Sequence, residues 1–194
     1  MNQTPNRKYF QLTNGQLEKV GNAMIYLSEK IQDISKTKLL KLLYLLDEFS
    51  IKKSGIPFLN LQYKVWRLGP VSESIFIELS DKPFRFNKFI SVKTDNGKAC
   101  IYPNTCFCDD EFSDNDMELL EYVSTTFKNT KTKELISYTH RLHSPWRNAA
   151  EANGIYDKLE TGEITNTDII INMIELVNHD ERKKNIYEQY VLEN

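Results

Sequence analysis

Long hydrophobic runs are missing from this sequence. The most apolar stretch, LLKLLYLL at residues 39–46, is interrupted by Lys41, whereas a helix that spans a bilayer needs about 20 predominantly apolar residues. The first residues, MNQTPNRKYFQLTNGQ, lack both the apolar core and the small-residue cleavage site of a secretory signal peptide. We therefore expect a cytoplasmic protein that has no membrane among its partners.

An excess of either charge is also missing, and cysteines are few. The chain has 25 Lys and Arg against 27 Asp and Glu, a formal net charge of -2, whereas a nucleic-acid-binding domain typically has a pI above about 9. Nucleic acid is therefore not an expected partner. Cys100, Cys106 and Cys108 are too few and too clustered for a disulfide framework in a reducing cytoplasm. No further ligand follows Cys106 and Cys108 at zinc-site spacing, so we predict no metal and no cofactor.

Common catalytic motifs are absent as well: the sequence has no glycine-rich phosphate loop, no G-x-S-x-G and no H-E-x-x-H. In THRLHSPW, His140 and His143 lie three residues apart, on one face of a predicted helix. Such a pair is able to ligate a metal or to act as a base in a small metal-dependent hydrolase. A structural interpretation is favoured, with His143 complementing the helix dipole and His140 donating to a buried carbonyl. We predict that the chain is not an enzyme.

Two charged clusters also have alternative interpretations. The acidic run DDEFSDNDMELLE, residues 109–121, offers oxygen ligands to a hard cation but lacks the calcium-loop pattern. Acidic residues at a helix entrance favour the helix dipole, which is the preferred interpretation. Lys38, Lys41 and Lys52 lie near one face of a predicted helix, where a phosphate-binding face is the weaker alternative.

Helical periodicity dominates the chain. A first helix is expected from about Asn14, and Ser35 is placed to cap KTKLLKLLYLLDEFSIKKS, which Gly55 ends in a left-handed conformation. Leucines on more than one face predict that this second helix is central and buried. The further helices predicted are SESIFIEL capped by Ser72, MELLEYVSTTFK after the capping box of Ser113 and Asp116, KELISYTHRL from Thr130 or Thr132, WRNAAEAN from Pro145, TDIIINMIELVNHD after Thr165 or Asn166, and ERKKNIYEQYVL.

Three segments have the alternation of β-strands. QYKVWRL, residues 62–68, reads as a strand that Gly69-Pro70 stops, and KFISVKT and KACIYP flank the turn residues Asp95-Asn96-Gly97. Together they predict a three-stranded antiparallel sheet. The expected fold is mainly α, of the α+β type: a compact helical domain with a small antiparallel β-sheet or hairpin inserted between helices. Residues 1–194 fit a single domain.

The segment YKVWRLGPVSESIF, residues 63–76, is rich in residue types that dominate protein interfaces. On a strand, Tyr63 and Arg67 point to one side and Trp66 to the other. Only one face of a small sheet packs on helices, so either Trp66 or the pair of Tyr63 and Arg67 faces outward. This segment is therefore a candidate binding patch.

The same region carries a family resemblance. KTKLLKLLYLLDEFSIKKSGIPFLNLQYKVWRLGPVSESIF resembles the first signature of the Panacea family, the SocA-like antitoxin domain, at Lys41, Leu42, Leu43, Tyr44, Gly55, Pro57, Tyr63, Trp66, Gly69, Pro70 and Val71. The second signature, a helix ending in T-H followed by P-W, is matched by Thr139, His140, Pro145 and Trp146. One departure is Leu68, where the family often has an aromatic residue. The resemblance spans about residues 15–150 and leaves a C-terminal helical extension, residues 155–194.

The resemblance implies a non-enzymatic antitoxin that binds a cognate toxin protein, encoded by an adjacent gene in a bacterial or phage toxin–antitoxin system. The alternative is a protease adaptor or interaction module that recruits a client, with a protease as a further partner. Lys41, Leu42, Leu43, Tyr44, Gly69 and Pro70 are expected to build the shared scaffold. The candidate partner-binding residues are Tyr63, Trp66, Arg67, His140 and Trp146, with His140, Trp146 and Tyr44 expected to close one polar-aromatic pocket.

Overall fold

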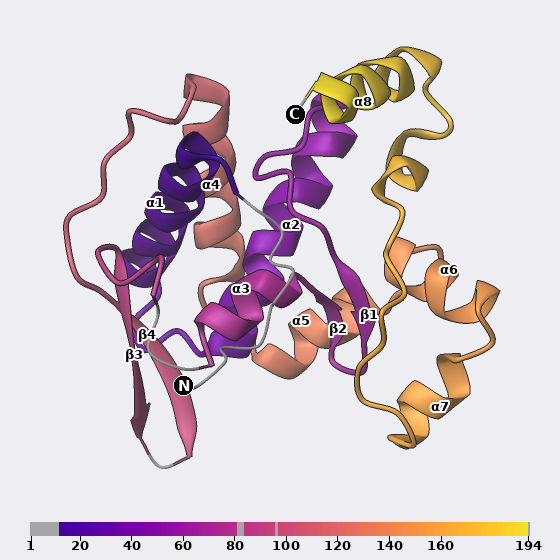
Figure 1. The fold of residues 1–194 in the computed structure, drawn as a ribbon, viewed down its shortest axis with the longest axis horizontal. Helices are drawn as coiled ribbons and strands as arrows, with labels where there is room; N and C mark the ends of the chain where they lie inside the picture. The colour runs from indigo at the N-terminus through magenta and orange to yellow at the C-terminus, as the bar shows by residue number, and fades with distance from the viewer. Residues whose placement is uncertain (1–11, 81–83, 96, 194) are drawn as a thin grey trace, which may run out of the picture.

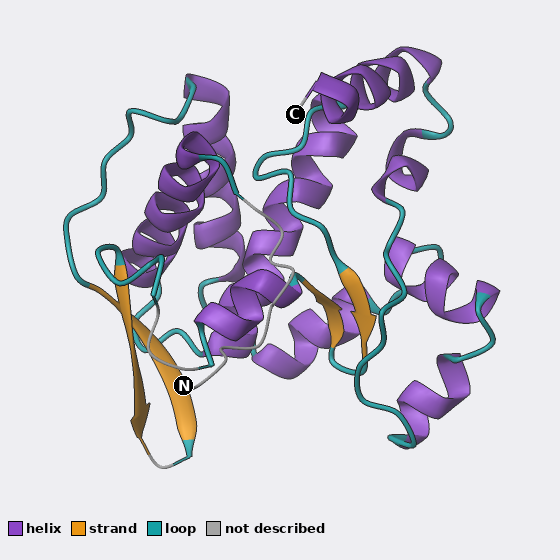
Figure 2. Cartoon of the chain, viewed as in Figure 1, coloured by secondary structure: helices purple, strands orange, loops and turns teal. Residues whose placement is uncertain are grey.

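The computed structural model describes residues 12–80, 84–95 and 97–193. Helix α2 (Lys36–Ser54) passes through the centre and is in contact with helices α1 (Asn14–Lys30), α4 (Asp114–Phe127), α5 (Thr132–Thr139) and α8 (Glu181–Glu193). In Figure 1, α1 and α4 lie on one side of α2, and α6 (Pro145–Ala152) and α7 (Tyr156–Thr161) lie on the other. The mainly helical fold with small antiparallel β elements is therefore confirmed (Figure 2).

The first two helices begin and end where local sequence signals place them. Thr13 and Gln16 form a capping box at the start of α1, and the Ser35 hydroxyl accepts from the backbone amide of Lys38 at the start of α2. Gly55 ends α2 with φ +83°, in the left-handed region that glycine adopts without a Cβ penalty. All the leucines of α2 are buried, as predicted. None of the described helices is long and apolar enough to cross a membrane.

The predicted three-stranded sheet is wrong. Strands β1 (Lys64–Trp66) and β2 (Gly69–Val71) form one antiparallel pair, and β3 (Ile90–Asp95) and β4 (Lys98–Pro103) form another. The hairpin of β3 and β4 packs on α1, and its Ile101 amide donates to the Ile34 carbonyl oxygen at 3.0 Å. Within the described residues, this hairpin forms no strand pairing with β1 or β2. Gly69 and Pro70 were predicted to follow the end of a strand, but they are the first two residues of β2. Asn96 of the predicted turn is outside the described residues.

The predicted helix TDIIINMIELVNHD is also wrong. Residues 163–172 are extended, and only Met173–Val177 form a short 3-10 helix, η1. Ile170 is 54% exposed between the less exposed Ile169 and Ile171, a period-2 alternation for which β-branched residues are suited. Helix α7, which ends at Gly162 with φ +78°, was not predicted.

The other helices agree with their predicted positions, with one exception in capping. The Ser113 capping box opens α4, α5 begins at Thr132, and Pro145 occupies the first turn of α6. Ser72 precedes α3 (Glu73–Glu78), but its hydroxyl lies 3.3 Å from the Ser74 hydroxyl and makes no cap bond. In the acidic run, Asp114 and Asp116 lie in the first turn of α4. The run therefore forms a helix entrance, which was its preferred interpretation.

Candidate functional site

The hairpin of β1 and β2 carries several of the predicted site residues. Trp66 pairs with Gly69, which leaves Arg67 and Leu68 in a tight turn at the tip. Gly69 has φ +99°, and a Cβ at this position would lie 2.6 Å from Oγ1 of Thr139 on α5. Glycine is required here because the hairpin lies directly against its supporting helices.

Tyr63 is part of the core beneath this hairpin. Its side chain is 1% exposed, and its hydroxyl donates to Oδ2 of Asp47 at 2.7 Å and to the Leu43 carbonyl oxygen at 3.2 Å. The Asp47 carboxylate also accepts from the backbone amides of residues 59, 60 and 61 at 2.6, 3.1 and 3.3 Å. Burial raises the pKa of Asp47 above its usual value. Through Asp47, Tyr63 thus helps to hold the loop of residues 59–61 in place. Its buried side chain presents no surface to a partner.

Asp47 was not singled out from the sequence. The signal available was an acidic residue within an otherwise apolar stretch, LLYLLDEF, where a carboxylate must find hydrogen-bond donors if it is buried.

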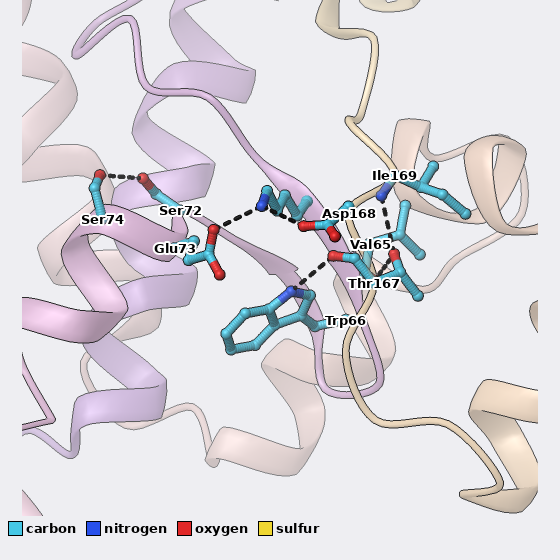
Figure 3. A network of polar contacts seen from close by, with 9 residues as sticks. Val65, Trp66, Ser72, Glu73, Ser74, Thr167, Asp168 and Ile169 are labelled. Carbon is cyan, nitrogen blue, oxygen red and sulfur yellow. Dashed lines mark hydrogen bonds and ion pairs between the residues drawn. The ribbon is translucent and has the colours of Figure 1, made fainter. Parts of the chain in front are cut away.

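Trp66 lies half-buried between the hairpin and the C-terminal part of the chain (Figure 3). Its indole Nε1 donates to the Thr167 carbonyl oxygen at 3.2 Å, and its ring meets Phe76 edge-on at 4.8 Å between centroids. Its backbone carbonyl accepts from Nε1 of Trp146 at 3.0 Å. Both tryptophans therefore contribute to one junction, but only Trp66 retains exposed ring surface.

The extended segment of residues 163–172 runs alongside β1 and completes this junction. The amides of Val65 and Arg67 donate to segment carbonyls at 2.9 and 2.8 Å, and Oγ1 of Thr167 donates to the Val65 carbonyl oxygen at 2.7 Å. Lys64 bridges the carboxylates of Glu73 and Asp168 at 2.6 and 2.7 Å. The β1 edge opposite β2 is thus paired by the chain itself.

His140 and Trp146 lie together, as their shared signature suggested. Their rings stack with centroids 3.6 Å apart and an interplanar angle of 4°. Burial, and then the charges of Lys41 and Arg147, lower the pKa of His140 to about 4, so the ring is neutral at pH 7. The predicted donation to a carbonyl is wrong: among the described residues, Nε2 has no partner, and Nδ1 faces a carboxylate of Glu160 at 3.6 Å. Trp146 is 0% exposed and belongs to the core.

The predicted histidine pair on one helix face is wrong. Helix α5 ends at Thr139, His140 is its C-cap, and His143 follows in a turn with φ +60° and an exposed side chain. Within the described ranges, no group of three or more His, Cys, Asp or Glu side chains is arranged to hold a metal.

The lysines of α2 do not form a shared phosphate-binding face. Nζ of Lys38 donates to the carbonyl oxygens of Lys128 and Thr130 at 2.8 Å each. Lys52 pairs with Glu48 at 2.5 Å. Each amine is used in a separate structural contact.

Lys41 is the unusual member of this helix. It is 1% exposed, and its Nζ donates to the Pro70 carbonyl oxygen at 2.8 Å. Burial alone lowers the pKa of its amine to about 7. Leu42, Leu43 and Tyr44 are fully buried beside it, and Tyr44 meets Tyr63 edge-on at 5.0 Å, so this motif supports the hairpin.

A pocket of about 360 Å³ opens next to Lys41 and the hairpin tip. Its lining consists of Thr37, Leu40, Lys41, Trp66, Arg67, Leu68, Val71, Phe76, Thr165 and Asn166. Two of the predicted partner-binding residues, Trp66 and Arg67, therefore border one hollow, whereas Tyr63, His140 and Trp146 are not among its lining residues. This pocket could not be predicted from local sequence patterns, because its walls come from four separate segments of the chain.

Residues 39–147 match the family described as the SocA-like antitoxin, Panacea domain. The chain belongs to the Panacea family. The matched residues contain both signature blocks, from Lys41 to Val71 and from Thr139 to Trp146. No curated protein and no solved structure matches the chain. Family membership associates the protein with toxin–antitoxin systems and suggests a non-enzymatic role with a toxin as partner.

Proposed function

We propose that this Panacea protein is an antitoxin that neutralises a cognate protein toxin by direct binding in the cytoplasm. The toxin would be encoded by an adjacent gene in a bacterial or phage system. The single observation that carries this proposal is the match over residues 39–147 to the SocA-like antitoxin family.

The hairpin tip is the surface we assign to the toxin. Leu68 is 49% exposed beside the exposed Arg67 and the half-buried Trp66, and these three residues border the 360 Å³ pocket. Aromatic and arginine side chains around a hollow supply most of the energy in many protein interfaces. A standard interface centred here would bury roughly 1,600 Å² in total.

The test is growth of a host that expresses each adjacent open reading frame, with and without this protein. Toxicity of one neighbour that co-expression relieves, together with co-purification of the two proteins, supports the proposal. The variant Leu68→Asp places a charge at the centre of the assigned surface and should weaken rescue and co-purification. Leu192→Asp is the matched control, because Leu192 is 87% exposed on α8, away from the hairpin.

Two outcomes would contradict this proposal. If no neighbour is toxic, the antitoxin role fails. If a folded Leu68→Asp variant rescues and co-purifies like Leu192→Asp, the hairpin tip is not the interface. Toxin abundance is measured in the same cultures, because a toxin whose level falls, while its purified complex stays active, would indicate a protease adaptor instead.

A further inference from the structure

The pocket beside the hairpin has an uneven distribution of charge. Its ten lining residues include two cations, Lys41 and Arg67, and no carboxylate. Within the described part of the chain, neither cation lies within 4.0 Å of a carboxylate oxygen. Arg67 instead lies against α7, where a Cβ at Gly162 would be 3.0 Å from its Cζ. The pocket is therefore complementary to an anion.

Lys41 has unused donor capacity. A lysine ammonium carries three N–H donors, and the Pro70 carbonyl oxygen is the one acceptor that the described residues give it. Burial that lowers the pKa of the amine to about 7 reflects the cost of charging it without a counter-ion. A carboxylate near Nζ would supply both the missing acceptor and the missing charge.

The rest of the lining is apolar. Trp66, Leu68, Val71 and Phe76 surround the hollow together with Leu40, so a ligand that fits it must have an apolar body as well as an anionic group. In a polypeptide, an apolar side chain and a carboxylate occur on the same residue only at the C-terminus. Capture of a C-terminal carboxylate is also a recurring mode of peptide recognition.

We propose that this pocket receives the C-terminal residue of the toxin, with its apolar side chain against Trp66 and Phe76 and its carboxylate paired with the buried amine of Lys41, while the exposed Arg67 adds positive charge to the pocket lining. This inference rests on the proposed antitoxin function, since it names how that partner is recognised.

The test uses a minimal probe of a C-terminal residue and needs no toxin. N-acetyl-L-phenylalanine carries the apolar side chain and the free carboxylate, and N-acetyl-L-phenylalaninamide has the same shape without the charge. Each is titrated into the purified full-length protein, and binding is followed by calorimetry and by tryptophan fluorescence, since Trp66 lines the pocket. The acid is expected to bind at least about tenfold more tightly than the amide, a difference of ~1.4 kcal/mol.

Two variants locate the effect. Lys41→Met keeps an unbranched side chain one atom shorter, without the amine, and should reduce the acid-to-amide ratio to about one. Arg67→Gln changes only an exposed position and should lower the ratio in part, so it tests the proposal even if Lys41→Met does not fold. Lys184→Gln on α8 is the control, because it removes a cation that is not part of the pocket lining.

Equal binding of acid and amide, failure of both probes at millimolar concentration, or an unchanged ratio in both pocket variants would overturn the inference. Because the titration contains no toxin, such a result leaves the rescue experiment with Leu68→Asp unaffected. Conversely, a clear carboxylate preference in a protein with no toxic neighbour would keep the pocket and remove its assigned partner.

Discussion

Replacing Asp47 with alanine is expected to be one of the most destabilising single changes in this protein. The carboxylate is 1% exposed and accepts hydrogen bonds from three backbone amides, those of residues 59, 60 and 61, and from the Tyr63 hydroxyl. A hydrogen bond to a charged group contributes about 1.5–3 kcal/mol, but burial of the carboxylate offsets much of the sum. Without the carboxylate these four donors lose their shared acceptor, and each buried donor left unsatisfied costs about 1–3 kcal/mol before the loop relaxes.

We therefore expect Asp47→Ala to lower the free energy of unfolding by about 4 kcal/mol, and the melting temperature by about 8–16 °C. Tyr63→Phe removes one of the donors, leaves the backbone bonds in place and should cost about 1.5–2 kcal/mol. Both variants and the double variant are measured by urea denaturation with far-UV circular dichroism.

The double variant separates the network from simple loss of packing. If Tyr63 is stabilised through Asp47, adding Tyr63→Phe to Asp47→Ala should cost at least about 1 kcal/mol less than in the wild-type protein. Full additivity of the two changes, or an Asp47→Ala variant within about 1 kcal/mol of wild type, would refute the assignment of this carboxylate as the residue that holds the loop.

Two further predictions concern backbone strain and pH. Gly69→Ala should be clearly more destabilising than Gly97→Ala in chemical denaturation. Both glycines have positive φ, but a Cβ at Gly69 would lie 2.6 Å from Oγ1 of Thr139, whereas a Cβ at Gly97 would have no neighbour within 4 Å. Equal losses of unfolding free energy in the two variants would contradict the close packing at Gly69. The pKa of His140 falls from 6.5 to about 4 on folding, so its stabilising effect is full above pH 6.5 and is lost as the pH falls toward 4. Wild type should lose about 2 kcal/mol between pH 7.5 and 5 relative to His140→Phe, and parallel pH profiles of the two proteins would contradict this.

Elements that depend on local signals were predictable. The capping residues Ser35 and Ser113, the left-handed Gly55 and the first-turn Pro145 each act within a few residues of the chain, so their effect can be inferred from a single sequence. The hairpin of β3 and β4 was predicted for the same reason, since alternation and a turn signal lie within one short segment.

Elements that depend on distant partners were not predictable. The stretch TDIIINMIELV was expected to be helical because Ile170, Ile174 and Val177 recur at helical spacing. Its conformation is decided by hydrogen bonds to β1, more than 90 residues earlier in the chain. Such tertiary pairing overrides local propensity.

In the candidate site, too, some contacts were predictable from the sequence and others depend on distant partners. The signature residues indicated that His140 and Trp146 meet, and the structure stacks them. The expected third member, Tyr44, instead packs against Tyr63. Aromatic type alone did not distinguish Trp66, which keeps exposed surface, from Tyr63, which hydrogen-bonds within the core.

The C-terminal extension limits where a partner is able to bind. The family match ends at residue 147, yet Ile171, Leu176 and Val177 beyond it are buried in the core. The amides of Val65 and Arg67 donate to carbonyls of this extension, and without it they would form an unpaired strand edge, a surface that readily accepts a strand from another chain. Since the protein fills this edge with its own residues, a partner that docks on the hairpin of the native fold has only its remaining exposed part to contact. That part is the tip and the mouth of the pocket beside it.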